Sequence, residues 1–93
     1  MKQVPADFVA YARTSLFTQE TLPQSLREAH STKPGVWAKI HLESGQVRFV
    51  DHSHQDELTL LSPELTGVVE PETLHHVEPI GNVQMYLEFY RRQ

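Results

Sequence analysis

Cysteine is absent from this chain of 93 residues. Disulfide bonds, thiolate metal centres and thiol-based catalysis are therefore excluded. A metal ion would have to be held by histidine, carboxylate, amide or tyrosine side chains. The chain has six histidines, which is many for its length, so these residues are the first candidates for a functional site.

Basic residues are also few. Eight Lys and Arg stand against twelve Asp and Glu, which gives a formal net charge of −4 and a pI near 5.8. Nucleic-acid binding calls for a basic surface that neutralises phosphates, so we expect no nucleic-acid partner. No apolar run approaches the ~20 residues that span a bilayer, and the first residues lack the apolar stretch of a secretory signal. We therefore expect no membrane partner and a cytoplasmic location.

Long segments uninterrupted by glycine or proline are scarce. Four glycines and six prolines divide the chain into short pieces, a pattern typical of all-β sandwiches and barrels. A chain of this length also supports only one small hydrophobic core. We therefore expect a single all-β domain over residues 1–93.

Two segments have the clearest strand patterns. Apolar and polar side chains alternate with a period of two in residues 36–42 and 83–90. Residues 43–46, Glu-Ser-Gly-Gln, predict a hairpin turn after the first segment. One short helical piece is expected at residues 23–29, with a proline in its first turn. Shorter strands are expected at residues 47–51, 58–61, 67–70 and 75–78.

The histidines differ in their surroundings. His52 and His54 lie among Asp, Ser and Gln, so we interpret them as part of a solvated loop rather than as a metal-binding pair. His41 lies on the less apolar side of the first strand, where a structural or surface role is the simpler interpretation. His75 and His76 are adjacent, so on a strand they point to opposite faces. The periodicity does not decide which of the two points inward.

Two further residues are candidates because of their positions. His30 follows the short helical piece and precedes a Thr-Lys-Pro-Gly turn into the first strong strand, which favours the rim of a pocket. Glu88 lies between two tyrosines on the less apolar face of the last strand. It could be an oxygen ligand, a partner of a ligand or an exposed residue.

Short motifs are spread over nearly the whole chain. They are Arg13-Thr14, Phe17, Leu22-Pro23, His30-Ser31-Thr32-Lys33-Pro34-Gly35-Val36-Trp37, Gly45, Pro71-Glu72-Thr73-Leu74-His75, Val77-Glu78-Pro79 and Glu88-Phe89-Tyr90-Arg91-Arg92. In these motifs the chain resembles the TehB/YeaR-like domain family, whose members are stand-alone proteins or the N-terminal domain of the tellurite-resistance methyltransferase TehB. The resemblance implies a cupin-like double-stranded β-helix, which is a small β-barrel of the jelly-roll type. Because a Gly-rich strand-to-helix loop for a nucleotide-like cofactor is missing, we do not expect methyltransferase activity.

The resemblance also implies which histidines form the site. His30 takes the first histidine position of the family, and His75, rather than His76, takes the second. Cupins usually provide two histidines and a glutamate in their first motif and another histidine in their second, and here the first motif is incomplete. A bound zinc, nickel, iron or copper ion would need a substitute ligand such as Glu88, His41 or His76. Otherwise the pocket is free of metal.

We therefore expect a His-lined pocket with His30 and His75 as metal ligands and with Lys33, Trp37 and Glu88 in its lining. The expected function is binding of a divalent metal ion, a small anionic ligand or both, with a link to tellurite or oxyanion stress. The alternatives are a small metal-dependent enzyme of the cupin type and an interaction domain without a metal site. Because a small β domain leaves edge strands, we also expect a homodimer.

Overall fold

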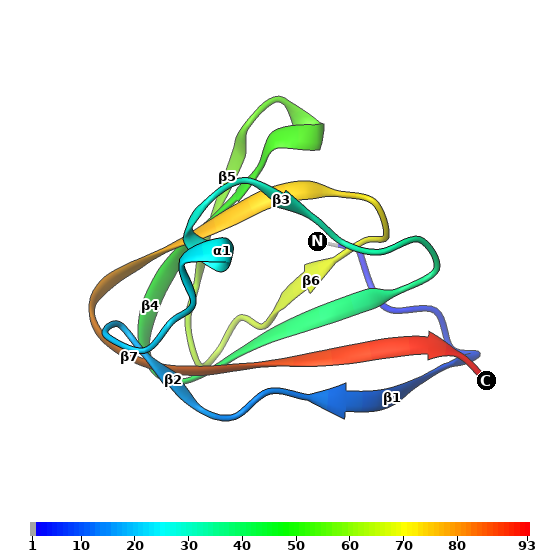
Figure 1. Ribbon diagram of the computed structural model, residues 1–93, viewed down its shortest axis with the longest axis horizontal. Helices are drawn as coiled ribbons and strands as arrows, with labels where there is room; N and C mark the ends of the chain where they lie inside the picture. The colour runs from blue at the N-terminus through cyan, green and yellow to red at the C-terminus, as the bar shows by residue number, and fades with distance from the viewer. Residues whose placement is uncertain (1) are drawn as a thin grey trace.

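Strands dominate the computed structural model, which describes residues 2–93. The elements in chain order are β1 (Phe8–Arg13), β2 (Phe17–Thr18), α1 (Gln24–Arg27), β3 (His30–Ser31), β4 (Trp37–Asp51), the 3-10 helix η1 (His52–His54), β5 (Glu57–Leu61), β6 (Gly67–Val69) and β7 (Leu74–Arg92). Within residues 2–93 the strands form one antiparallel sheet of seven members. The prediction of an all-β fold is confirmed, and the curved sheet in Figure 1 is consistent with a small cupin-like barrel.

The two long strands β4 and β7 organise the sheet. They pair with each other over nearly their whole length, from Trp37 opposite Tyr90 to Asp51 opposite His75. The shorter strands β1, β2 and β3 pair with β7, whereas β5 and β6 pair with β4. In Figure 1, β7 passes along the lower side of the molecule, bends at the left and lies along the upper side. Its first half can therefore pair with β3 while its second half pairs with β1.

The bend in β4 corrects one expectation from the sequence. Residues 43–46 do not form a hairpin turn, because β4 continues through them with register shifts against β7 between Leu42 and Gln46. Gly45 has a φ of +81°, and a Cβ atom there would lie 2.3 Å from the backbone oxygen of Asn82. A glycine with positive φ serves a turn or a bulge equally well. The pairing partner decides between them, and the local sequence does not reveal that partner.

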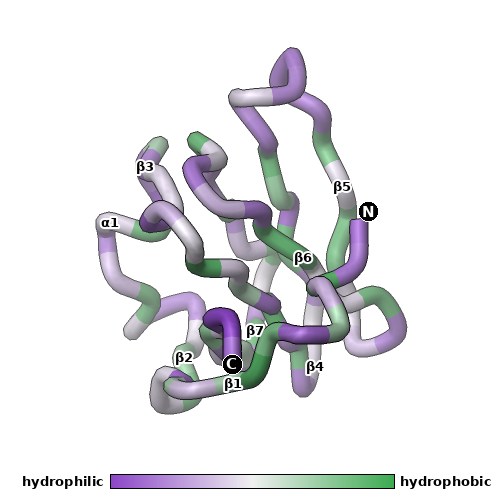
Figure 2. The backbone as a smooth tube through the Cα atoms, turned by 90° about the vertical axis from the view of Figure 1, so that its right-hand side faces the viewer, coloured by the Kyte–Doolittle hydropathy of each residue, from purple (hydrophilic) through white to green (hydrophobic). Residues whose placement is uncertain are grey.

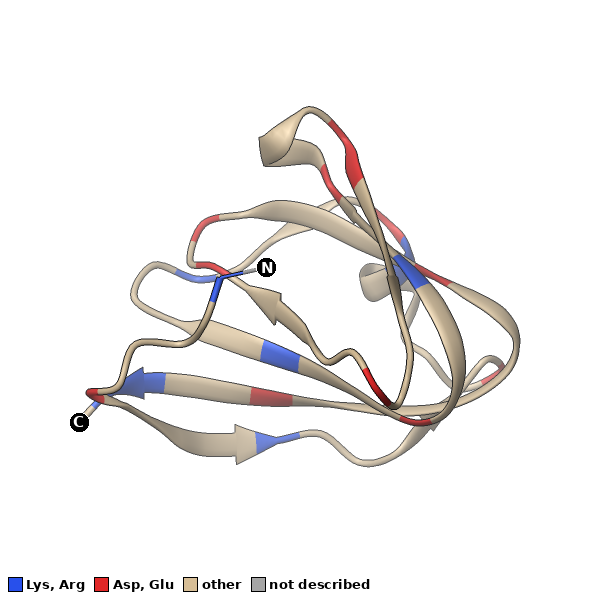
Figure 3. Ribbon diagram, turned by 180° about the vertical axis from the view of Figure 1, so that it is seen from behind, with Lys and Arg blue, Asp and Glu red and all other residues tan. Residues whose placement is uncertain are grey.

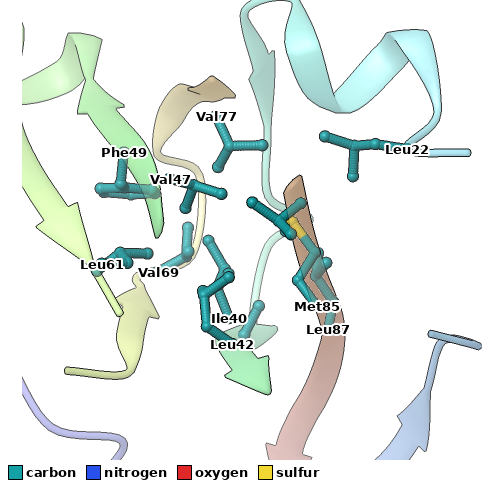
Figure 4. Packing of buried hydrophobic residues seen from close by; sticks show 12 residues of the cluster. Leu22, Ile40, Leu42, Val47, Phe49, Leu61, Val69, Val77, Met85 and Leu87 are labelled. Atoms are coloured by element: carbon teal, nitrogen blue, oxygen red, sulfur yellow. The ribbon is translucent and has the colours of Figure 1, made fainter. Parts of the chain in front are cut away.

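The hydrophobic core lies on the concave side of the bent sheet. Its most deeply buried side chains include Ile40, Val47, Leu61, Val69 and Met85, all of which are labelled in Figure 4. Full burial of such a side chain contributes roughly 1.5–3 kcal/mol, so this cluster provides most of the stabilisation of the fold. The strand alternation predicted for residues 36–42 and 83–90 is confirmed by the burial pattern of β4 and β7.

The ends of the sheet and the helices complete the fold. The short helix predicted near Pro23 is confirmed, and its Leu26 packs partly against the core. Strand β1 is not predicted by the sequence pattern, because its side chains are mostly exposed and do not alternate cleanly. Neither helix within residues 2–93 has the length and the apolar character needed to cross a membrane.

The connection from β4 to β5 forms the most polar end of the molecule. It contains η1, projects from one end of the molecule and is largely hydrophilic in Figure 2. Figure 3 shows acidic residues on both sides of this connection, while basic residues are dispersed over several strands. The predicted polar loop is therefore present, although its histidines have specific partners that are described below.

Candidate functional site

A pocket of about 340 Å³ lies between β3, the turn that precedes β4 and the concave face of the sheet. Its apolar wall consists of Leu26, Val36, Ala38, Val69, Leu87 and Phe89. Its polar residues include His30, Thr32, Lys33 and His75. Three of the five site residues expected from the sequence, namely the two histidines and the lysine, therefore line the same pocket.

The pairing of β3 with β7 brings His30 and His75 together. The two residues are direct partners in the antiparallel ladder, and their ring centroids are 4.2 Å apart with an angle of 57° between the ring planes. His75 is only 4% exposed, whereas the adjacent His76 points to the opposite side of the strand and contacts the β4–β5 connection. The structure thus shows that His75, and not His76, points inward, which the periodicity left open.

Backbone carbonyl groups orient both imidazole rings. Nδ1 of His30 is 3.0 Å from the carbonyl oxygen of Glu28, and Nδ1 of His75 is 2.7 Å from that of Thr73. A carbonyl oxygen only accepts hydrogen bonds, so each Nδ1 carries the proton and donates it. In the neutral rings the lone pair is therefore on Nε2. A fixed tautomer of this kind is characteristic of metal-binding histidines, whose second ring nitrogen donates to a carbonyl or carboxylate group.

The environment of His75 favours its neutral form. Burial penalises the charged imidazolium and lowers the pKa of His75 from 6.5 to about 4. The hydrogen bond to the Thr73 carbonyl group opposes this shift, and the neighbouring His30 adds to it. The ring of Phe49, whose centroid is 5.5 Å from that of His75, forms part of the apolar surroundings. At pH 7 the Nε2 lone pair of His75 is consequently available to a cation or to a hydrogen-bond donor.

The described residues provide an incomplete set of ligands for a metal ion. Residues 2–93 contain no group of three or more His, Asp or Glu side chains placed to hold one ion. Two imidazoles would leave the other coordination positions to water or to a ligand with donor atoms. The buried hydroxyl oxygen of Thr32 has no hydrogen-bond partner in the described part of the chain. It is an additional polar group beside the pocket.

Trp37 does not line this pocket, which corrects the expected site. Its ring packs against Phe8 of β1 in an edge-on arrangement, with 6.4 Å between the ring centroids. The neighbouring Ala38 takes the inward position on β4 and lines the pocket instead. Because side chains on a strand alternate between faces, the inward position of Ala38 places Trp37 on the convex face.

Glu88 is also outside the pocket lining, because the adjacent Leu87 and Phe89 occupy the inward positions of β7. Its carboxylate accepts hydrogen bonds from the hydroxyl group of Tyr90 at 2.6 Å and from Nε2 of His41 at 3.0 Å. The bond from Tyr90, followed by that from His41, lowers the pKa of Glu88. Burial together with this carboxylate raises the pKa of Tyr90 to about 12. Glu88 is therefore committed to a network on the convex face.

The possible substitute ligands are likewise directed away from the pocket. His41 stacks on the ring of Tyr86, with 4.7 Å between the centroids, and donates to Glu88. His76 lies on the convex side of β7 and contacts His52 and Glu78. None of these three alternatives considered from the sequence, Glu88, His41 or His76, joins His30 and His75 in the pocket lining.

Some pocket residues were not expected from the sequence. Thr32 lies inside the motif that runs from residue 30 to residue 37, so its position beside His30 was a usable signal. Tyr11 also lines the pocket, but it belongs to β1, a strand that the pattern does not predict. The apolar wall follows from the strand alternation once the inward face is known.

Comparisons with known proteins identify the family of the chain. A family model described as "TehB-like domain" matches residues 12–87. The chain is 28% identical over 89 residues to a protein of Haemophilus influenzae strain 10810 called "Probable S-adenosyl-L-methionine-dependent methyltransferase TehB", with 90% of this chain and 31% of that protein covered. The chain thus spans about a third of the length of the curated relatives it matches.

Two solved structures share the fold. A crystal structure of an Escherichia coli K12 protein superimposes with a TM-score of 0.91 at 22% identity and covers 100% of this chain and 99% of that chain. The crystal structure of TehB from Haemophilus influenzae gives a TM-score of 0.84 at 27% identity, with 94% of this chain and 32% of that chain covered. At the lower of these identities the likeness describes the fold alone.

Proposed function

The chain belongs to the TehB-like domain family, and from this premise we propose that its pocket binds a divalent metal ion through His30 and His75. Zinc, nickel, iron and copper are the candidate ions, because all of them accept neutral imidazole ligands. The observation that carries the proposal is that the two rings are adjacent and are held in the same way, each with Nδ1 fixed by a carbonyl group and with Nε2 left as the ligand atom.

We further propose that a small anionic ligand occupies the rest of the pocket. Two protein nitrogens leave open positions on a metal ion, which an oxyanion can take. Lys33 supplies a positive charge beside the pocket, and the unpartnered hydroxyl group of Thr32 supplies a hydrogen-bond donor. The apolar wall excludes water and so strengthens both interactions. Tellurite or a related oxyanion is the ligand that best suits the family link to tellurite resistance.

The methyltransferase activity in the name of the relatives is not part of this proposal. It belongs to proteins of which this chain covers about a third. A binding domain accounts for the features of the pocket without a chemical step. A homodimer and a cytoplasmic location remain predictions from the sequence.

The metal part of the proposal is tested by calorimetry. Zn²⁺ is titrated into protein from which bound metal has been removed with a chelator. We expect His30→Ala and His75→Ala each to lower the Zn²⁺ affinity of the pocket site at least tenfold, because either change removes one of two protein ligands. Glu88→Gln is the matched control on the opposite face of β7 and should stay within twofold. Equal affinities in the wild type and both alanine variants would refute the proposal.

The anion part is tested separately with tellurite as the probe. Tellurite is titrated into the Zn²⁺-loaded and the metal-free protein, and the same titrations are repeated for Lys33→Ala and for His75→Ala. We expect binding to the loaded wild type and at least fivefold weaker binding to the variant, since the lysine provides the charge. Binding that is unaffected by Lys33→Ala and by His75→Ala would place the anion elsewhere.

A further inference from the structure

A second histidine pair lies outside the pocket. His52 of η1 and His76 of β7 meet edge to edge, with ring centroids 4.8 Å apart and an angle of 22° between the planes. Nε2 of His52 and Nδ1 of His76 face each other at 2.7 Å. The other nitrogen of each ring contacts a carboxylate, Asp56 at 2.6 Å for His52 and Glu78 at 2.7 Å for His76. The four side chains therefore form one continuous row.

The protons of this row are fixed by its two ends. An ionised carboxylate only accepts hydrogen bonds, so Nδ1 of His52 and Nε2 of His76 must carry the donated protons. The hydrogen bond from His76 lowers the pKa of Glu78, which keeps that carboxylate ionised at neutral pH. In two neutral rings the facing nitrogens, Nε2 of His52 and Nδ1 of His76, are then both lone-pair atoms. Two lone pairs at 2.7 Å repel each other unless a positive charge lies between them.

We propose that Nε2 of His52 and Nδ1 of His76 form a binding site for a divalent transition-metal ion such as Zn²⁺ or Ni²⁺, separate from the pocket. A tetrahedral metal ion with nitrogen ligands at about 2.0–2.1 Å holds them roughly 3.3 Å apart, so the gap of 2.7 Å has to widen by about 0.6 Å and the rings have to turn towards the ion. The two carboxylates fix the tautomers of the rings, as carboxylates do beside metal-binding histidines.

The surroundings of the row suit a cation. Asp51 lies in the same turn, and its carboxylate accepts hydrogen bonds from the backbone N–H of Ser53 and from Nδ1 of His54. Acidic residues colour both sides of this turn in Figure 3. The side chains of His52 and His76 are 25% and 16% exposed, so an ion can reach them from solvent and complete its coordination with water. At the far end of the row, the charge of Arg48 helps to lower the pKa of Glu78. Arg48 is therefore a basic group that opposes the negative potential of the acidic residues.

This site shares no ligand with the pocket, although the charges of Asp51 and His52 act on His75. His76 and His75 are neighbours in sequence, but they lie on opposite faces of β7. The row also has only two nitrogens that face each other, which agrees with the absence of any three-residue metal cluster in residues 2–93. Water molecules would fill the other positions, and the expected affinity is accordingly moderate.

The test is a Zn²⁺ and a Ni²⁺ titration of His75→Ala, in which the pocket site is disabled. We expect one remaining site, and at least tenfold weaker binding when His52→Ala is added to this background. His54→Ala added instead is the matched control, because His54 lies in the same turn but is paired with Asp51, and it should change the affinity less than twofold. Absence of binding to His75→Ala, or an equal loss in both double variants, would overturn the surface site.

A measurement on the wild type covers the case in which His75→Ala does not fold. Nitrogen-15 imidazole NMR spectra are recorded while Zn²⁺ is added, and each histidine is followed separately. We expect the resonances of Nε2 of His52 and Nδ1 of His76 to shift together as one further Zn²⁺ binds per protein, in addition to the ion in the pocket. Shifts of His30 and His75 without any change at His52 and His76 would refute the surface site and leave the pocket proposal intact.

Discussion

The two histidine pairs of this protein use the same side chain in opposite settings. In the pocket, His30 and His75 are oriented by neutral backbone carbonyl groups and are surrounded by apolar residues. On the convex face, His52 and His76 are oriented by carboxylates and are partly open to solvent. A carbonyl group fixes the tautomer without adding charge, and burial lowers the pKa of His75 so that its ring is neutral, whereas a carboxylate fixes the tautomer and places a full negative charge beside the ring.

The difference arises from a single step along β7. His75 and His76 are adjacent, and the alternation of a strand sends one to the concave face and the other to the convex face. Each then meets a partner from a segment distant in sequence, since β3 supplies His30 and η1 supplies His52. Two imidazole pairs with different electrostatics are thereby formed at one point of the sheet.

The largest expected effect is on the pH dependence of stability. The pKa of His75 is about 4 in the folded protein and 6.5 in the unfolded chain, so the unfolded state binds more protons between these values. The contribution of His75 is therefore complete above pH 6.5 and is lost as the pH falls towards 4. We expect a loss of about 3 kcal/mol at pH 4. Urea unfolding is measured at pH 7 and at pH 4 for the metal-free wild type and for His75→Leu. The loss due to His75 is the difference between the two proteins in how much stability they lose between these pH values.

His54→Ala is the control for this experiment, because its side chain is 52% exposed and lies outside the pocket lining. It should retain the pH dependence of the wild type. If His75→Leu and the wild type lose the same stability between pH 7 and pH 4, the neutral buried state of His75 is incorrect.

A somewhat smaller effect is expected for truncation at pH 7. His75→Ala removes a buried ring beside the core and should lower the free energy of unfolding by about 2 kcal/mol, the lower end of the range for large-to-small core changes. His54→Ala should stay within about 0.5 kcal/mol, as is typical of surface substitutions. Chemical denaturation with matched m-values provides the comparison. Equal costs for the two variants would contradict the assignment of buried and exposed faces.

The smallest expected effect concerns the convex face alone. Glu88→Gln removes the negative charge that, together with burial, raises the pKa of Tyr90, so the pKa of that tyrosine should fall from about 12 while remaining above 10. Ultraviolet absorbance during an alkaline titration follows the tyrosinate form. A pKa of Tyr90 that is the same in the variant and the wild type would contradict the assignment of Glu88 to the network on the convex face.

Strand alternation was sufficient to predict the core and the all-β fold. It also contained information about the site that was not used when the site residues were chosen. The alternation of residues 83–90 already placed Glu88 on the face opposite Leu87, so its assignment to the pocket conflicted with the pattern. The same reasoning applies to Trp37 and Ala38 on β4. The alternation that identifies core residues should therefore also decide which side chains can line the pocket.

Other features depend on contacts between distant segments and could not be predicted in this way. The bulge at Gly45 requires β7 as a partner on both sides of the bend. The row through His52 and His76 requires the β4–β5 connection to fold back onto β7, and the local composition indicated only a polar loop. The resemblance to a known family, and not the periodicity, selected His75 over His76.

The central claim is that His30 and His75 share one metal ion through their Nε2 atoms. The most direct test is a crystal structure of the Zn²⁺-loaded protein, with anomalous diffraction data collected above and below the zinc edge. The account predicts an anomalous peak in the pocket at about 2.0–2.1 Å from Nε2 of both residues, with Nδ1 of each still donating to Glu28 and Thr73. A pocket without such a peak at saturating Zn²⁺, or an ion bound through Nδ1 after rotation of either ring, would contradict it.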